Sequence, residues 1–220
     1  MTHTPFDFKT LDSKDIYKLL IGTVVPRPIA WVTTISPEGV VNAAPYSFFN
    51  CLSSEPPILA LGIENREHRS LKDTAANIRH TEEFTVNIVG RSNIDAMNIT
   101  ATAFPEAVNE LAEAGLTMID GVSVSCPRIA EAPVSFECKR HIGLEISPSR
   151  EIVLGMVQQA FIRSDIVNPT NHHTDHAKLD AVGRMGGHGY AFSLDYFDLP
   201  GISVEQYESG EYPRYADMIV

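Results

Sequence analysis

The chain has 220 residues, a usual size for one domain, and 44% of them are hydrophobic, which is enough for a core without metals or disulfides. A formal net charge of −11 at pH 7 argues against binding to nucleic acids and to anionic membrane surfaces. A small anionic ligand is still compatible with this charge, because a local group of cations and backbone N–H groups can hold a phosphate.

The first part of the chain predicts a helix, a hairpin and a third strand. Residues 13–20 (SKDIYKLL) predict a short helix with Ser13 as its N-cap. RPIAWVTTIS (27–36) and VVNAAPYSFFN flank the turn SPEGV as two strands of a hairpin. Pro45 interrupts the second of these strands, which we therefore expect at a sheet edge or a bulge. The next strand is expected over residues 56–64.

Helices and strands then alternate. SLKDTAANIRHT (70–81) predicts a helix capped by Ser70, and EFTVNIVG (83–90) alternates as a half-buried strand does. Helical segments are expected within 93–114, and two strands with a proline-marked kink within 123–146. A strand over 151–165 contains Gly155, which indicates a bulge or bend. A short helical turn and a glycine-rich, strand-like segment follow, and the polar tail from Pro200 is expected to wrap a surface.

Many short strands and few helices predict a mainly β fold, a β-barrel with peripheral helices. No linker divides the sequence, so we expect one domain over residues 1–220, with a core at about 20–195 and a C-terminal tail at 200–220. The chain has neither a signal-peptide pattern nor an apolar run as long as a membrane span, so a cytoplasmic protein without membrane contact is expected. Cys51, Cys126 and Cys138 form no C-x-x-C motif, which indicates free thiols.

One candidate anion site is the segment SLKDT. Ser70, Lys72 and Thr74 lie at the predicted start of a helix, where unpaired N–H groups and the helix dipole favour an anion. The same residues also fit an ordinary N-cap followed by a solvated lysine, because serine is common at that position. Spacing alone leaves both interpretations open.

Polar side chains also gather on the predicted hairpin, at Thr33, Thr34, Ser36, Ser47 and Asn50. Residues at alternate positions of a strand share a face, so a planar heterocycle at the barrel rim can receive hydrogen bonds from this region. The alternative is that threonine is simply a good strand former and that the aromatic residues of PYSFFN fill the core.

The histidine-rich segment NHHTDH places His172 and His176 four residues apart, which is a metal-ligand spacing on a helix. Pro169 and Asn171 indicate a loop, and no H-E-x-x-H pattern occurs, so we expect no metal site. G-x-S-x-G and G-x-x-x-x-G-K-[ST] are both absent, and GRMGGHG lacks a strand–turn–helix frame. No catalytic residue can be assigned from these patterns.

Three separated stretches together resemble a known family. VPRPIAWVTTISPEGVVNAAPYSFFNCLSSEPPILALGI, KDTAANIRHTEEFTVNIV and LDAVGRMGGHGYA are similar to the flavin reductase-like family, the FMN-binding split barrels that include flavoredoxins. The resemblance runs from Val25 to Tyr190 with the segments in order. It implies a homodimer of split β-barrels that binds FMN near the subunit interface.

The resemblance also implies where FMN binds. The isoalloxazine ring is expected against the backbone of Thr33, Thr34, Ile35 and Ser36 and of Ser47, Phe48, Phe49 and Asn50. The phosphate is expected at Ser70, Lys72, Asp73 and Thr74, with Arg27 as a second cation. Arg184 is expected to reach the site from either subunit.

The expected activity is that of an FMN-dependent NAD(P)H:flavin oxidoreductase. The protein would stack the nicotinamide on the flavin and stabilise the charge that develops on it, without a strong acid or base. Expected acceptors are free flavin, ferric iron or a partner oxygenase. The sequence contains no separate NAD(P)H motif, so the donor stays open. The alternatives are a flavoredoxin-like electron carrier and a non-enzymatic flavin- or haem-binding barrel.

Overall fold

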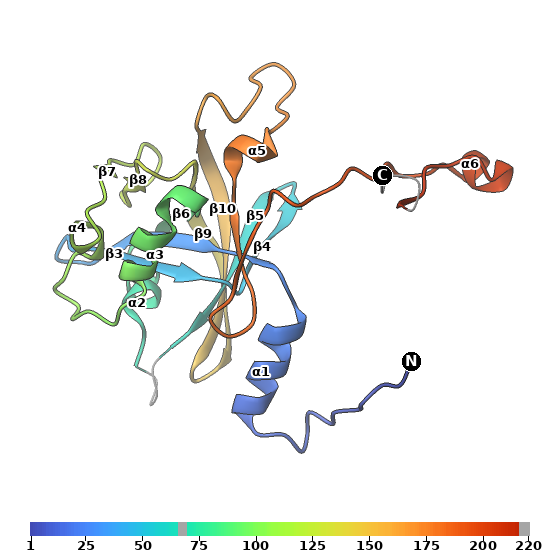
Figure 1. The fold of residues 1–220 in the computed structure, drawn as a ribbon. Coiled ribbons are helices and arrows are strands. Elements are labelled where there is room, and N and C mark those ends of the chain that lie inside the picture. Colours follow the sequence, from blue (N-terminus) through green and yellow to red (C-terminus); the bar gives the residue numbers. More distant parts are fainter. Residues whose placement is uncertain (66–69, 216–220) are drawn as a thin grey trace.

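The computed structural model describes residues 1–65 and 70–215, which fold around antiparallel strands (Figure 1). The helices are α1 (Ser13–Thr23), α2 (Asp73–Thr81), α3 (Ile94–Thr100), α4 (Glu110–Glu113), α5 (His176–Leu179) and α6 (Val204–Ser209), with a 3₁₀ turn η2 (Arg91–Asn93). The strands are β1 (Arg27–Pro28), β2 (Ala30–Ile35), β3 (Val41–Tyr46), β4 (Phe49–Ser54), β5 (Pro57–Glu64), β6 (Glu83–Ile88), β7 (Met118–Ile119), β8 (Arg128–Ile129), β9 (Val134–Ser147), β10 (Arg150–Ile162), β11 (Val182–Arg184) and β12 (Tyr190–Phe192).

The main sheet has seven strands in the order β3-β2-β6-β9-β10-β5-β4. A smaller sheet pairs β1, β11 and β12, and β7 pairs with β8. The predicted mainly β fold with peripheral helices is confirmed. The hairpin of β2 and β3 is also confirmed, with Thr34 opposite Asn42 and Trp31 opposite Pro45.

Pro45 lies in β3, an edge strand of the main sheet, as the sequence predicts. The backbone N–H of Ala43 points away from β2 and donates to Glu110 Oε2 at 3.1 Å. Because N–H directions alternate along a strand, residue 45 occupies the same outward edge as residue 43. Proline has no N–H to contribute there, so the ladder to β2 loses no hydrogen bond.

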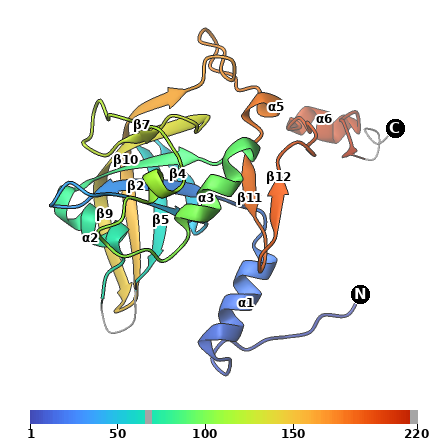
Figure 2. The ribbon, with the colours of Figure 1, turned by 60° about the vertical axis from the view of Figure 1, so that its left-hand side comes forward.

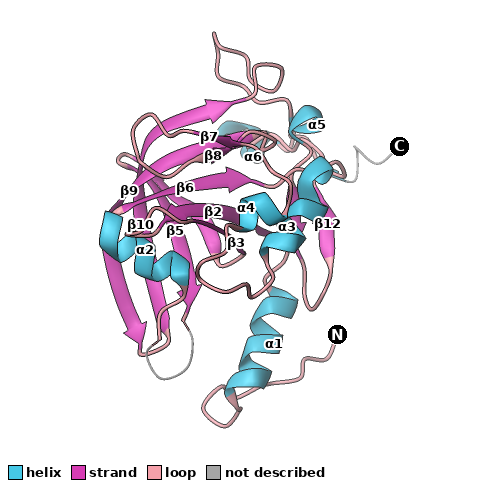
Figure 3. Ribbon diagram, turned by 90° about the vertical axis from the view of Figure 1, so that its left-hand side faces the viewer, coloured by secondary structure: helices cyan, strands magenta, loops and turns pink. Residues whose placement is uncertain are grey.

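Alternate residues of β2 enter two hydrophobic clusters on opposite faces of the sheet. Val32 packs in one cluster with Phe84 and with Ile78 of α2. Trp31 packs in the other with Met97 of α3 and Leu111 of α4. Figure 3 shows α2 apart from α3 and α4, which cover the second cluster. The helices are thus fixed against the sheet near β3, where the candidate site is found.

The two N-caps predicted from the sequence, Ser13 and Ser70, are both wrong. Helix α1 is capped by Asp12, whose carboxylate accepts the Asp15 N–H at 2.8 Å, and Ser13 is its first residue. Helix α2 begins at Asp73, with extended Lys72 in the N-cap position. Ser70 is therefore not the cap. The Lys72 N–H donates to Asn65 Oδ1 at 3.1 Å, and the helix begins at the next residue, three positions after Ser70.

The bulge predicted at Gly155 is confirmed, since the register of β10 against β9 shifts between Leu154 and Gly155. A Cβ atom at Gly155 would overlap the ring of Phe84, which lies in the first hydrophobic cluster. The glycine therefore allows β10 to approach the core closely at the bend.

The tail from Pro200, which was expected to wrap a surface, does not wrap the barrel of its own chain. Figure 1 shows the described C-terminal segment and α6 extending away from the sheets. Its aromatic contacts are made within the tail region, as between Phe197 and Tyr215, whose ring centroids lie 4.5 Å apart. Large side chains such as Leu199 and Val204 stay exposed.

Of the helices in the described ranges, none has the length and apolar character needed to span a membrane.

Candidate functional site

Two adjoining cavities lie beside β3. Cavity A has a volume of about 330 Å³ and cavity B about 630 Å³. Both are within the range of small-molecule sites. They share a border formed by Tyr17, Ile21, Pro45, Ser47 and Ala101, so they form one continuous trench. Figure 2 shows α1, which carries Tyr17 and Ile21, beneath the turn between β11 and β12.

The outer edge of β3 runs along this trench. No strand of the described ranges pairs with that edge, and its residues Ala44 and Pro45 line cavity A. The Ala43 N–H is bound by Glu110 and Pro45 has no N–H, so this edge presents mainly carbonyl oxygens that need a partner. It can therefore hydrogen-bond the polar edge of a flat ligand. Pro45 contributes only its carbonyl to that edge.

A buried polar network forms one wall of cavity A. Asn42 and Thr74 are joined by a hydrogen bond of 3.0 Å, and Glu110 accepts the Ala43 N–H. Burial raises the pKa of the Tyr46 hydroxyl to about 12, so Tyr46 remains a neutral O–H group at physiological pH. Burial also raises the pKa of the Glu110 carboxyl above its ordinary value of 4.5. The wall thus combines amide, hydroxyl and carboxyl groups.

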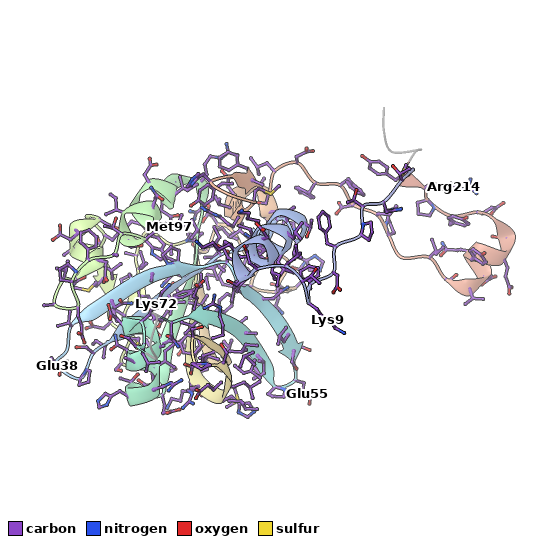
Figure 4. The ribbon with its side chains drawn as sticks, turned by 90° about the horizontal axis from the view of Figure 1, so that it is seen from below. Lys9, Glu38, Glu55, Lys72, Met97 and Arg214 are labelled. Atoms are coloured by element: carbon purple, nitrogen blue, oxygen red, sulfur yellow. The ribbon has the colours of Figure 1, made fainter. Side chains whose placement is uncertain are left out.

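The start of α2 forms one end of cavity A. Lys72 and Thr74 both line the cavity, and Lys72, the N-cap of this nine-residue helix, makes no side-chain capping hydrogen bond to the described residues. The Lys72 ammonium lies 6.0 Å from the centroid of the Tyr46 ring. Figure 4 labels Lys72 on the body of the molecule, whereas Arg214 lies on the C-terminal segment that extends away. A helix N-terminus with an adjacent ammonium favours an anion.

Carboxyl groups also border cavity A, at Glu64, Asp73 and Glu110. Glu64 forms an ion pair with Arg150 at 2.9 Å. Because the pKa of Glu110 is raised, a smaller fraction of this carboxyl is ionised at a given pH than in an exposed glutamate. Carboxylates accept hydrogen bonds from hydroxyl and N–H groups. The cavity therefore suits a ligand that has one anionic end and several hydrogen-bond donors elsewhere.

Cavity B has a different electrostatic character. Arg27, Arg184 and His188 line it together with one carboxylate, Asp95. Its remaining wall is largely apolar and includes Met97 and Tyr190. Cationic and aromatic groups therefore face the part of the trench that lies away from Lys72.

Arg27 is almost fully buried, with 6% of its surface exposed. Its Nη1 donates to the carbonyl oxygens of Ile21 and Val24, each at 2.7 Å, and its Nη2 donates to Met185 O at 3.2 Å. Its buried Nε has no partner among the described residues. The sequence predicted a second cation for a phosphate. The structure instead directs three of its interactions to carbonyls at the end of α1 and in the β11–β12 turn.

Arg184 is half-buried and keeps most of its donors available. Its guanidinium lies 4.5 Å from the centroid of the Tyr190 ring, and Nη2 donates to Gly187 O at 2.6 Å. Stacking on an aromatic ring fixes the plane of a guanidinium and leaves its outer N–H groups free to bind a ligand.

The structure brings half of the residues predicted for the cofactor to the trench. Its lining includes Arg27, Ser47, Phe48, Lys72, Asp73, Thr74 and Arg184. It does not include Thr33, Thr34, Ile35, Ser36, Phe49, Asn50 or Ser70. The Thr33 hydroxyl donates to the Pro127 carbonyl, and Thr34 Oγ1 accepts from Asn77 Nδ2 at 3.0 Å. Both threonine side chains are therefore engaged within the protein.

Sequence reasoning missed three parts of the trench. Helix α1 supplies Tyr17 and Ile21, the end of α3 and the segment after it supply residues 100–104, and α4 supplies its first residue, Glu110. Asn109 before Glu110 is an N-cap signal, because its side chain accepts the N–H of Leu111 at 3.0 Å. That signal locates the helix but not the cavity.

The histidine-rich segment forms a loop that leads into α5. His172 has a positive φ of 60°, and the ring of His176 packs edge-on against Tyr196 at 5.5 Å. No group of three or more His, Cys, Asp or Glu side chains in residues 1–65 and 70–215 is placed to hold a metal ion. This segment takes no part in the trench.

A model of the flavin reductase like domain matches residues 21–178. The chain belongs to the flavin reductase-like family. An uncharacterized protein of Aquifex aeolicus is 41% identical over 185 residues, which are 84% of this chain and 93% of the relative.

Solved structures agree with this family. Nitrilotriacetate monooxygenase component B from Bacillus cereus is 31% identical with a TM-score of 0.86, covering 90% of this chain and 100% of its own. A flavin reductase with a split barrel domain from Shewanella frigidimarina has a TM-score of 0.78 at 19% identity, covering 91% and 100%. The fold of this flavin reductase-like protein is therefore the split barrel.

Proposed function

We propose that this protein is an FMN-dependent oxidoreductase that binds FMN in cavity A and takes a hydride from NAD(P)H. The observation that carries the proposal is the unpaired outer edge of β3, which lies between an anion-binding helix start at Lys72 and a cationic cavity at Arg184. Membership of the flavin reductase-like family supports a flavin as the ligand.

The residues of cavity A fit FMN in their chemistry. The phosphate would be held by Lys72, Thr74 and N–H groups at the start of α2. The hydroxyls of the ribityl chain would donate to Glu110 and Asn42, which border the same cavity. The polar edge of the ring would face the backbone of β3, and Tyr17 with Phe48 would cover it.

When bound, FMN supplies the redox chemistry: it accepts a hydride from reduced nicotinamide and passes electrons to an acceptor. The protein's own side chains would bind and orient the flavin and the nicotinamide. Tyr17 and Phe48 form an edge-to-face pair with centroids 6.4 Å apart, at the mouth of cavity A. Such a pair provides flat apolar surfaces beside the trench.

We also infer that the protein is a homodimer. Ile142 and Leu144 alternate along β9, so they share a face, and Ile146 follows them at an irregularity in the pairing with β10; each of the three is more than 40% exposed. The described tail adds further exposed apolar side chains. Apolar groups gathered on one face of a strand and on an extended tail are typical of surfaces that a second copy covers. A gel-filtration volume of a monomer would contradict this part of the proposal.

The electron acceptor is proposed to be free flavin, ferric iron or a partner oxygenase. The oxygenase is supported by the likeness to a monooxygenase component B. The donor assignment is tested by adding NADH and then NADPH to the FMN-loaded protein without air. Loss of the visible flavin absorption with either donor supports the oxidoreductase. Bound FMN that stays oxidised with both would indicate an electron carrier, and a protein that binds no FMN would contradict the whole proposal.

A further inference from the structure

Cavity B carries positive charge that an FMN phosphate at Lys72 would not use. Arg184 and His188 line it opposite the single carboxylate of Asp95, and none of these three residues lines cavity A. The trench thus has two cationic regions on either side of a shared border. One phosphate cannot be bound at both ends of such a trench, so the second region calls for a second anion.

Arg184 is the residue best placed to contact that anion. Its guanidinium plane is fixed against Tyr190, and the hydrogen bond from Nη2 to Gly187 O leaves further N–H groups available. A fixed guanidinium matches phosphate oxygens with two parallel hydrogen bonds. His188, exposed in the same turn, adds a further donor at the mouth of the cavity.

Arg27 helps to position the turn that carries Arg184 and His188. It hydrogen-bonds both the carbonyl end of α1 and Met185, the residue that follows Arg184. Because it is nearly fully buried, its positive charge acts on cavity B through a medium of low polarity. Arg27 is therefore a positioning residue that also makes the cavity more attractive to an anion.

We propose that cavity B binds the phosphate groups of the nicotinamide dinucleotide, with Arg184 as the contacting residue. This inference rests on the proposed function. Two substrates that each carry phosphate repel one another, so each needs its own cation when both occupy one trench. Lys72 serves FMN in cavity A and Arg184 serves the electron donor in cavity B, and their ring systems meet at the shared border.

The test is Arg184→Gln, with Arg184→Lys as the conservative variant and Arg163→Gln as the control. Arg163 is an exposed arginine that is ion-paired with Asp165 and lines neither cavity. Each protein is titrated with FMN, and KM is then measured for NADH, for NADPH and for N-benzyl-dihydronicotinamide. The last donor carries the same reactive ring but no phosphate.

Arg184→Gln is expected to raise KM for NADH and NADPH by about 10- to 100-fold, the loss of a charge-assisted hydrogen bond. The FMN affinity and the rate with the uncharged donor should change by much less, which also shows that the variant is folded. Arg184→Lys should recover part of the loss, and Arg163→Gln should match the wild type. Equal effects on NADH and NADPH indicate the shared pyrophosphate, and an effect on NADPH alone indicates the 2′-phosphate.

Two results would overturn this assignment while leaving an FMN-dependent oxidoreductase, though not always the placement of FMN in cavity A, intact. One is a loss of FMN affinity in Arg184→Gln with an unchanged KM for both dinucleotides, which would move the flavin phosphate to cavity B. The other is an equal loss with the charged and uncharged donors. Failure of the wild-type protein to bind FMN would instead overturn the proposed function itself.

Discussion

The guanidinium of Arg27 and the carbonyl of Ile21 are joined by a hydrogen bond of 2.7 Å that closes the end of α1. Helix α1 has no fully buried residue, so contacts at its end add to the packing of Tyr17 against Phe48. A second bond of 2.7 Å reaches Val24 O, in the C-cap residue. Arg27 therefore helps to orient Tyr17 and Ile21 beside both cavities.

We expect Arg27→Gln to lower the free energy of unfolding by about 1.5–3 kcal/mol, because hydrogen bonds from a charged donor are lost. Urea titration measures this loss, and hydrogen exchange in residues 13–24 should become faster. Arg163→Gln removes an exposed ion pair and should cost less than about 1 kcal/mol. Unchanged exchange in α1 would show that something else holds the helix.

Glu110 predicts a pH dependence of stability. Its pKa is raised in the folded protein, mainly by burial, so its contribution to stability is fully present below the ordinary value of 4.5 and is lost as the pH rises through the raised value. Glu110→Gln keeps an oxygen for the Ala43 N–H and cannot ionise. The variant should therefore gain stability relative to the wild type as the pH increases above 4.5.

Urea titrations at a series of pH values measure this difference. Glu113→Gln, on the exposed side of the same helix, is the matched control. A stability difference between Glu110→Gln and the wild type that stays constant with pH would contradict the account of the buried carboxyl.

The three thiols are expected to differ in reactivity. Burial raises the pKa values of Cys126 and Cys138 to about 12, whereas Cys51 is exposed on the edge strand β4. Because the thiolate is the reactive form, DTNB should modify Cys51 alone in the native protein and all three cysteines in urea. Rapid modification of Cys126 or Cys138 without urea would show that the core opens on the timescale of the reaction.

The histidine-rich loop is expected to have no effect on flavin binding. His172→Ala combined with His176→Ala is expected to leave the FMN affinity unchanged, because neither residue lines the trench. Metal analysis of the purified wild-type protein should stay near background. Stoichiometric zinc that is lost in the double variant would contradict this expectation.

The fold was largely predictable because its signals are local. Proline in a strand requires an unpaired edge, which places Pro45 in β3, and glycine in a long strand indicates the bend at Gly155. The cap of α2 was predicted wrongly at Ser70, because the decisive contact is the bond between Lys72 and Asn65. Asn65 is far enough along the chain that no local pattern includes both partners.

The site was predictable only in part, because sequence does not show which way each strand faces. Thr33 and Ser47 carry similar hydroxyls, yet Thr33 is fully buried under Pro127 and Ser47 borders both cavities. Tyr17 and Glu110 reach the trench only through the tertiary packing of α1 and α4. The family resemblance indicated the segment from Ser47 to Phe48 and the start of α2, which line the trench, but also residues 33–36 of β2, which do not.

The most direct test of the central claim compares the binding of FMN and of riboflavin, which differ only in the phosphate. Wild-type protein should bind FMN more tightly by about 1.5–3 kcal/mol, the value of a charge-assisted hydrogen bond. Lys72→Ala should remove most of that preference and leave riboflavin binding unchanged, whereas Lys178→Ala, an exposed lysine away from the trench, should not. A preference for FMN that survives in Lys72→Ala, or equal binding of both flavins by the wild type, would contradict the assignment of cavity A.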